Sequence, residues 1–245
     1  MGSLGSRTCE VLNASGAGVR VGLIDTGVDS RHADLAGSIA GNYEAVMGFV
    51  DNFVDPVEHG QDHNAHGTAC AGILHRAAPG ALIHSVQVIG EHPRDHPEKL
   101  IAGLRFAVER RWEVINISAG ANYPHDELRE LVRSAHAAGT ILIAAKDNRA
   151  GHIGYPAAFP EVICVDMEHF PSPLQWRYHP DAVIEVEASG IYIEAPVAGG
   201  GRRSFTGTSF AAPSIAGLAA RFKERFPQKG MPAFRTFLER HRSDG

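Results

Sequence analysis

The chain has 245 residues, of which 44% are hydrophobic and 21% charged, and its formal net charge is −5. This length and composition are typical of a globular α/β enzyme with a substantial core. The acidic balance and the absence of a long basic run argue against nucleic acid and anionic membranes as partners, and no apolar run approaches the roughly 20 residues of a membrane helix.

The N-terminal stretch has a leader-like composition. Residues 1–6 formally fit a myristoylation pattern, but a Gly/Ser-rich start is also typical of a cloning remnant, and no secretory signal pattern is visible. We therefore expect residues 1–18 to be a flexible leader and residues 19–245 to form one domain. The three cysteines, Cys9, Cys70 and Cys164, lack a CxxC spacing and do not indicate a disulfide framework, which favours a reducing, cytoplasmic setting.

Short apolar runs rich in β-branched residues alternate along the chain with helical patterns. Runs without strict apolar–polar alternation are typical of strands covered on both faces. In chain order, the predicted elements are strand 19–24, helix 66–74, strand 81–89, helix 99–111, strand 114–118, helix 126–138, strand 140–144, strand 162–165, helix 208–226 and helix 231–240. This alternation predicts an α/β fold with a mostly parallel central sheet and helices on both faces.

Three polar residues stand at the ends of these predicted elements. Asp25 follows the first strand, His66 opens the first helix, and Ser209 stands at the start of a later helix. Each alone has a structural explanation: a turn Asp, a solvated His and a helix-capping Ser. Together they are an acid, a base and a nucleophile for acyl transfer, in the chain order Asp…His…Ser.

The segments around these residues resemble the active-site blocks of subtilases, the subtilisin-like serine proteases of peptidase family S8. The similar segments are residues 24–29, 66–68, 114–118, 154–157, 195–196 and 207–213. The resemblance implies a subtilisin-like three-layer fold and a serine endopeptidase without a cofactor. It also implies that Asp25, His66 and Ser209 form the catalytic triad.

The same resemblance implies the groups that bind a substrate. Asn148 matches the oxyanion-hole residue, with a turn Asn as the alternative. Residues 118–120 match the edge that pairs with an extended peptide, with a simple turn as the alternative. The implied substrate-binding residues are Ser118, Ala119, Gly120, Ala145 and Asp147. The expected partner is therefore a peptide or protein in extended conformation; the oligomeric state is not readable from the sequence.

Asp147 departs from the family pattern, which has glycine at this position. Two alternatives carry equal weight. The carboxylate could bias the primary specificity pocket toward a basic side chain, or narrow it, because a carboxylate in a cleft attracts cations. It could instead face solvent and pair with Lys146 or Arg149.

Two further departures concern calcium and the N-terminus. Residues 74–79 run directly to the next strand, without the calcium loop of many secreted subtilases. Asp34 matches a calcium ligand of the family but lacks the six to eight oxygens that calcium needs, so we expect it to cap or pair locally without an ion. Only about eighteen residues precede the first strand, too few for an inhibitory pro-domain, so either such a segment has been removed or the enzyme folds unaided. An intracellular enzyme that trims leader peptides from natural-product precursors fits this pattern by analogy.

Other functions stay open at this point. A transpeptidase or macrocyclase could use the same triad but would need a lid that excludes water, and a non-catalytic binding module is a further alternative. The pairs His63/His66 and His92/His96 have zinc-like spacings, but Pro93 and Pro97 disfavour a helix at the second pair, and no metal is expected. Pro213 lies inside a predicted helix, where we expect it to be tolerated within about the first turn.

Overall fold

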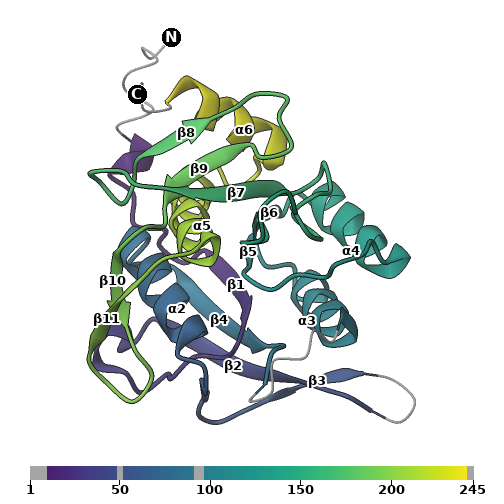
Figure 1. Ribbon diagram of the computed structural model, residues 1–245, viewed down its shortest axis with the longest axis vertical. Helices are drawn as coiled ribbons and strands as arrows, with labels where there is room; N and C mark the ends of the chain where they lie inside the picture. Colours follow the sequence, from purple (N-terminus) through teal and green to yellow (C-terminus); the bar gives the residue numbers. More distant parts are fainter. Residues whose placement is uncertain (1–9, 49–51, 91–96, 242–245) are drawn as a thin grey trace.

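The computed structural model describes residues 10–48, 52–90 and 97–241. Its centre is a nine-stranded sheet in the order β3-β2-β4-β1-β5-β6-β7-β9-β8 (Figure 1). The strands are β1 (Arg20–Asp25), β2 (Ile39–Val46), β3 (Phe53–Pro56), β4 (Leu82–Gln87), β5 (Val114–Ile117), β6 (Ile141–Ala145), β7 (Ile163–Glu168), β8 (Trp176–Tyr178) and β9 (Val186–Ser189). The edge strands β3 and β8 pair antiparallel with their neighbours, and the other pairs are parallel.

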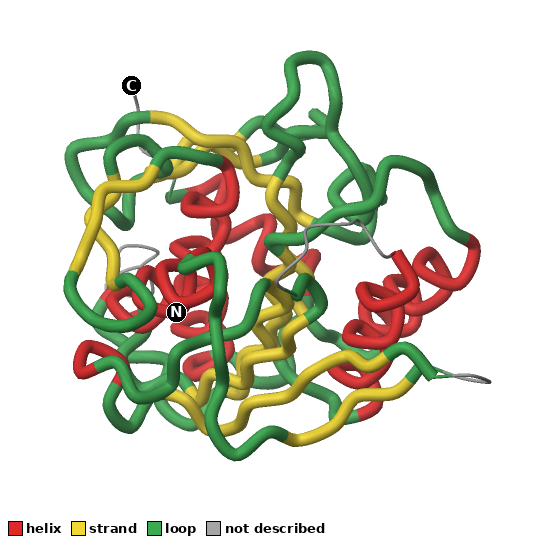
Figure 2. The backbone as a smooth tube through the Cα atoms, turned by 60° about the horizontal axis from the view of Figure 1, so that its bottom comes forward, coloured by secondary structure: helices red, strands yellow, loops and turns green. Residues whose placement is uncertain are grey.

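Helices cover both faces of this sheet (Figures 1 and 2). The helices are α2 (His66–Ala77), α3 (Pro97–Glu109), α4 (Asp126–Ala137), α5 (Thr208–Arg225) and α6 (Met231–Arg240), with a 3₁₀ turn at Ala33–Leu35. One layer contains α2 and α5, and the other contains α3 and α4. The three-layer α/β prediction with a mostly parallel sheet is confirmed. None of the helices in the described ranges is long and apolar enough to cross a membrane.

Small residues bring α2 and α5 close together on one face of the sheet. A Cβ atom added to Gly217 of α5 would lie only 2.4 Å from the Cβ of Ala77 in α2. Nearly every residue of α5 is buried, because this helix packs on five neighbouring strands as well as on α2. A separate antiparallel hairpin, β10 (Ile193–Pro196) and β11 (Arg202–Phe205), packs beside α2. These contacts fix the starts of α2 and α5 relative to β1.

Residues 10–18 pack against α5, although their composition predicts a flexible leader. Val11 is fully buried, and the Glu224 carboxylate of α5 accepts the backbone N–H of Ala17 at 2.8 Å. The flexible-leader prediction is therefore wrong for this stretch, because its buried apolar side chains and several charged side chains of α5, namely Arg221, Glu224 and Arg225, hold it. Residues 1–9, which include the myristoylation-like start, lie outside the described ranges.

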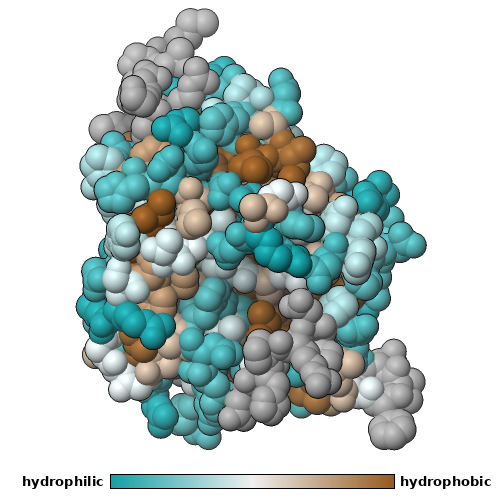
Figure 3. Space-filling view, in the orientation of Figure 1, coloured by the Kyte–Doolittle hydropathy of each residue, from teal (hydrophilic) through white to brown (hydrophobic). Residues whose placement is uncertain are grey.

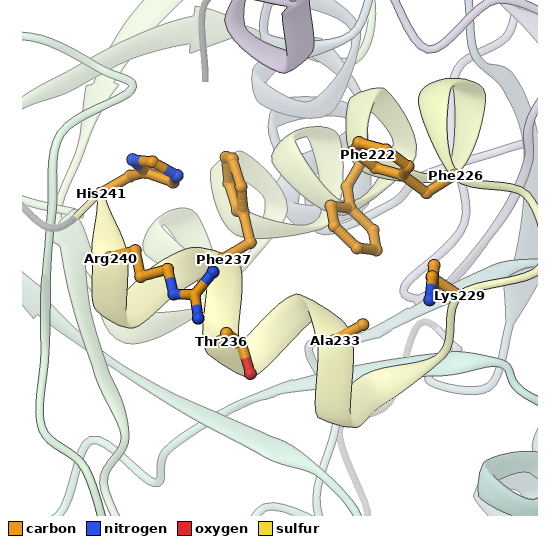
Figure 4. Close-up of a pocket in the computed structure, with 8 residues that line it drawn as sticks. All are labelled: Phe222, Phe226, Lys229, Ala233, Thr236, Phe237, Arg240 and His241. Atoms are coloured by element: carbon orange, nitrogen blue, oxygen red, sulfur yellow. The ribbon is translucent and has the colours of Figure 1, made fainter. Parts of the chain in front are cut away.

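The face shown in Figure 3 is mainly hydrophilic, with small hydrophobic areas between polar side chains, as is usual for a globular protein. A cavity of about 290 Å³ lies between the end of α5 and α6 (Figure 4). Phe222, Phe226 and Phe237 contribute its apolar surface, with Lys229 and Arg240 beside them. None of the site residues predicted from the sequence lines this cavity.

Candidate active site

Asp25 and His66 meet where the end of β1 approaches the start of α2. Asp25 is 1% exposed, and its Oδ1 accepts a hydrogen bond from His66 Nδ1 at 2.6 Å. The approach depends on Gly67, since a Cβ there would lie 2.0 Å from the carbonyl oxygen of Gly27. The bond to Asp25 places the imidazole proton on Nδ1, which leaves Nε2 able to accept a proton.

The environment of His66 strengthens it as a base. Burial lowers the pKa of His66, but the charge and hydrogen bond of Asp25 and the charge of Asp62 outweigh that effect. The pKa of His66 is therefore raised above its ordinary value of 6.5. Since only the neutral imidazole accepts a proton, activity that depends on it should fall as the pH drops through this raised pKa.

Asp62 is a residue of the site that the sequence analysis missed. Its Oδ1 accepts the hydroxyl of Thr26 at 2.8 Å, and its Oδ2 accepts the backbone N–H of Thr68 at 2.8 Å. The Thr26 hydroxyl oxygen in turn accepts the N–H of Gly67 at 2.9 Å. Asp62 thus ties the end of β1 to the first turn of α2. A carboxylate just before a helix is a capping signal that could have identified it.

Replacing Asp62 with asparagine should move the acid limb of the kcat/KM profile to lower pH. The variant removes one of the negative charges that raise the pKa of His66, while its amide oxygen can still accept the Thr26 hydroxyl. The measurement is kcat/KM against pH, with the exposed Asp55→Asn on β3 as the matched control. An unchanged acid limb in Asp62→Asn would show that this carboxylate does not act on the base.

Ser209 is the second residue of α5, where backbone N–H groups have no acceptor within the helix. Pro213, four residues later, has no N–H to donate to the Ser209 carbonyl. That carbonyl instead accepts Cys70 Sγ–H at 3.3 Å and Ser118 Oγ–H at 3.4 Å. Pro213 therefore lies beyond the first turn, contrary to the sequence-based expectation, and the helix bond it removes is replaced by ties to α2 and to the end of β5.

Ser209 and His66 lie on either side of Cys70. The sulfur that donates to the Ser209 carbonyl is 3.8 Å from His66 Nδ1. The ring of Phe210, the residue after Ser209, has its centroid 5.0 Å from that of His66. Within the described ranges no hydrogen bond joins the Ser209 hydroxyl to His66, a looseness common in sites without substrate.

A cavity of about 460 Å³ opens beside Ser209, between the segments that follow β5 and β6. All the predicted substrate-binding residues and the predicted oxyanion residue line it, namely Ser118, Ala119, Gly120, Ala145, Asp147 and Asn148. The structure thus brings together side chains from widely separated parts of the sequence at the carboxyl ends of parallel strands, where ligands bind in open α/β sheets.

Asn148 is oriented by the residue that precedes Ser209. Its Oδ1 accepts the backbone N–H of Thr208 at 3.1 Å, while the Thr208 hydroxyl donates to the Lys146 carbonyl at 2.5 Å. This bond engages the amide oxygen and not the Nδ2 group, which carries the two donors of the side chain. The bond joins Asn148 to a residue 60 positions away, and the oxyanion role of Asn148 stays a prediction.

Replacing Asn148 with alanine should lower kcat by about 10²- to 10³-fold, because a donor to the developing oxyanion is lost. Asn148→Asp provides the discriminating comparison, since it keeps an acceptor for Thr208 but has no NH₂ donors. Steady-state kinetics should show at least as large a loss in Asn148→Asp. Full activity in that variant would mean that Asn148 only holds Thr208 in place.

Asp147 lines the cavity and pairs with Arg149. Its Oδ1 accepts the backbone N–H of Arg149 at 2.8 Å, and both carboxylate oxygens accept Arg149 Nε, at 3.1 and 3.0 Å. These hydrogen bonds lower the pKa of Asp147. Lys146, the other proposed partner, pairs with Asp166 at 3.0 Å. The predicted pairing of Asp147 with Arg149 is therefore present. The Asp147 side chain also lines the cavity, which the solvent-facing alternative did not expect.

Potential metal ligands converge at one place in the described structure. Among the described residues, the one group of potential ligands that converges is Asp25, His66 and Cys70. Burial raises the pKa of the Cys70 thiol well above its ordinary value, with the charge of Asp25 adding to the effect. His63 is not part of this group, and His92 and His96 lie outside the described residues.

Asp34, the calcium-ligand position of the family, has a basic partner. Its Oδ2 accepts a hydrogen bond from Arg202 Nη1 at 2.6 Å. Arg202 belongs to β11 and is distant in the sequence, so the prediction of a local partner is wrong. A guanidinium beside this carboxylate does not fit a calcium ion, which is held by oxygen ligands.

Comparisons with known proteins agree with this geometry. The sequence model of the subtilase family matches residues 16–242. Thermitase from Thermoactinomyces vulgaris is 32% identical over 84% of this chain and 75% of that protein. An intracellular serine protease from Paenibacillus polymyxa is 30% identical over 85% of this chain and 68% of that protein.

The similarity to two further proteins is partial in length. Subtilisin E from Bacillus subtilis (strain 168) is 29% identical over 87% of this chain, which spans 57% of that protein. The crystal structure of fervidolysin from Fervidobacterium pennivorans, a keratinolytic enzyme related to subtilisin, has a TM-score of 0.73 and 24% identity. It covers 93% of this chain and 39% of that chain, and it shows the same fold. The family match extends over nearly the whole sequence, and this chain belongs to the subtilase family.

Proposed function

We propose that this protein is a serine endopeptidase that hydrolyses peptide bonds through an acyl-enzyme intermediate. The observation that carries the proposal is the 2.6 Å hydrogen bond between Asp25 and His66. Ser209, at the start of α5, lies nearby and lines the same cavity as Asn148. Acyl transfer needs this set of acid, base, nucleophile and oxyanion donor. Membership of the subtilase family supports the same reaction.

Each residue has a distinct part in the proposed mechanism. Ser209 attacks the scissile carbonyl, and His66 takes the proton from its hydroxyl and then gives it to the leaving amine. Asp25 holds the imidazole and stabilises its positive charge. The oxyanion receives hydrogen bonds from the backbone N–H of Ser209, assisted by the positive end of the α5 dipole, and from Asn148 Nδ2.

The substrate is a peptide in extended conformation. Residues 118–120 follow β5, line the cavity and have small side chains, so their backbone is accessible for strand-like pairing with a peptide. Ala145 and Asp147, which follow or end β6, form the facing wall and contact the side chain on the acyl side of the scissile bond.

The proposed setting is the cytoplasm, with specialised processing such as removal of a leader peptide from a natural-product precursor. The support is the relative from Paenibacillus polymyxa that is named an intracellular serine protease, together with the two free, buried cysteines Cys70 and Cys164. Expression with a labelled precursor peptide, followed by fractionation and mass spectrometry, tests this assignment.

The function itself is tested with a fluorophosphonate probe and a mixed peptide library, both analysed by mass spectrometry. Labelling of Ser209 together with library cleavage supports an endopeptidase. Labelling with cyclic or ligated products instead of linear fragments would replace hydrolysis with transpeptidation, because an amine rather than water then accepts the acyl group. Neither labelling nor cleavage in the folded protein would favour a non-catalytic binding module.

A further inference from the structure

The guanidinium of Arg149 connects the two walls of the cavity beside Ser209. Asp147 lies on the wall that follows β6 and is bound at both carboxylate oxygens by the Arg149 guanidinium. The same guanidinium donates through Nη2 to the side-chain oxygen of Asn122, on the wall that follows β5. Arg149 therefore spans the cavity from one wall to the other.

The Asp147 carboxylate lies along the cavity. A Cβ atom added to Gly154, another lining residue, would be 3.6 Å from Asp147 Cβ and 4.0 Å from its Oδ2. The backbone N–H of Asp147 donates to the Ile153 carbonyl at 2.8 Å, which fixes the side chain against this part of the wall. The Asp147 side chain is 21% exposed and the Arg149 side chain 56%, so Asp147 is the more buried partner of the pair.

The charges that line the cavity in the described structure are matched in pairs. They belong to Lys146, Asp147 and Arg149, and the other lining residues carry no charge. Asp147 is matched by Arg149, and Lys146 is matched by Asp166 from β7 at 3.0 Å. A charged side chain entering here would lose water and find its possible counter-charge already engaged, next to a charge of its own sign.

We propose that the Asp147–Arg149 pair is a specificity determinant that admits uncharged side chains on the acyl side of the scissile bond and rejects both signs of charge. The inference rests on the proposed endopeptidase function, because it assigns this cavity to that side chain. A substrate lysine must displace Arg149 from Asp147, and a substrate glutamate must displace Asp147 from Arg149. Uncharged side chains leave the pair intact and contact walls such as Ala119, Ala145 and Ile153.

The test uses three peptides that differ only in having leucine, lysine or glutamate at this position. Wild-type kcat/KM should favour leucine over both charged residues. Arg149→Gln leaves Asp147 unpaired and should raise the Lys/Leu ratio about tenfold, whereas Asp147→Asn should raise the Glu/Leu ratio about tenfold. In the double variant, both ratios should return to within about threefold of wild type, because neither charge remains.

Arg133→Gln is the matched control. It removes one positive charge that pairs with Glu130 on α4, outside the cavity, so its three ratios should equal those of wild type. If Arg149→Gln and Asp147→Asn are labelled at Ser209 but keep the wild-type ratios, or shift them in the same direction, the inference is overturned and the endopeptidase assignment stands. If the wild-type protein is neither labelled nor cleaves any peptide, the proposed function itself fails.

Discussion

Replacing Ser209 with alanine is expected to lower kcat by about 10⁶-fold, the scale known for the nucleophile of subtilisin, which belongs to the same family. The change removes only the hydroxyl. The ties that position the start of α5 use the backbone carbonyl of this residue, which accepts Cys70 and Ser118 and is retained in the variant. Fluorophosphonate labelling should disappear, and the melting temperature should stay within about 2 °C of wild type.

Ser204→Ala is the control for this variant, since Ser204 is an exposed serine on β11. It should keep full turnover and full labelling at Ser209. A folded Ser209→Ala protein that still turns over peptides within about tenfold of wild type would show that the nucleophile is another residue. Loss of the folded state would show that the Ser209 hydroxyl has a structural part that its contacts do not indicate.

The centre of the fold could be predicted because local sequence determines it. Strands such as Val114–Ile117 and Ile141–Ala145 are buried on both faces, so their side chains are apolar with the single exception of Asn116, and the pattern is strong. Helices such as α4 carry an apolar stripe and end at glycine, and their observed bounds lie close to the predicted ones. The triad positions follow from short motifs at the ends of such elements, where few conformations are possible.

The edges of the fold could not be predicted in the same way. In β2 most residues are half-buried, and it contains Gly41, so neither a continuous apolar run nor a clean alternation appears. Strand β8 has three residues, and β9, β10 and β11 have four each, which is too short for a periodicity to emerge. Their pairing depends on neighbours already in place, and tertiary context decides it.

The contacts that refine the site join residues that no local pattern links. Asp62 acts on His66 because the loop before α2 places its carboxylate at the first turn of that helix. In the sequence, Asp62 resembles any acidic residue in a turn. The pair of Asp147 with Arg149 was one of two open alternatives, but its bridge to Asn122 depends on the spacing of the two walls. The effect of Pro213 on α5 could also be seen only in the structure. The Ser209 carbonyl, which has no helix donor at Pro213, accepts Cys70 Sγ–H from α2 instead.

Replacing Asp25 with asparagine should lower kcat by about 10⁴-fold, the scale known for loss of the triad acid in subtilisin. Asp25 Oδ1 accepts both His66 Nδ1 at 2.6 Å and the backbone N–H of Thr26 at 2.7 Å, so the amide oxygen of the variant should take this position. The imidazole then keeps its tautomer but loses the negative charge that stabilises its protonated form. Because Asp25 raises the pKa of His66, the acid limb of the pH profile should move to lower pH as the rate falls.

The same variant should also be less stable, for a separate reason. Asp25 Oδ2 is buried and has no hydrogen-bond partner among the described residues, so an amide NH₂ in its place would be a buried donor without an acceptor, at a cost of about 1–3 kcal/mol. Kinetics and thermal unfolding measured on one preparation separate the two effects, and Asp62→Asn is the reference, since it removes a nearby charge without touching the imidazole. Asp62→Asn should shift the acid limb in the same direction but retain most of kcat. If Asp25→Asn keeps more than about a tenth of wild-type kcat, the charge of Asp25 does not support the base, and the triad assignment falls with it.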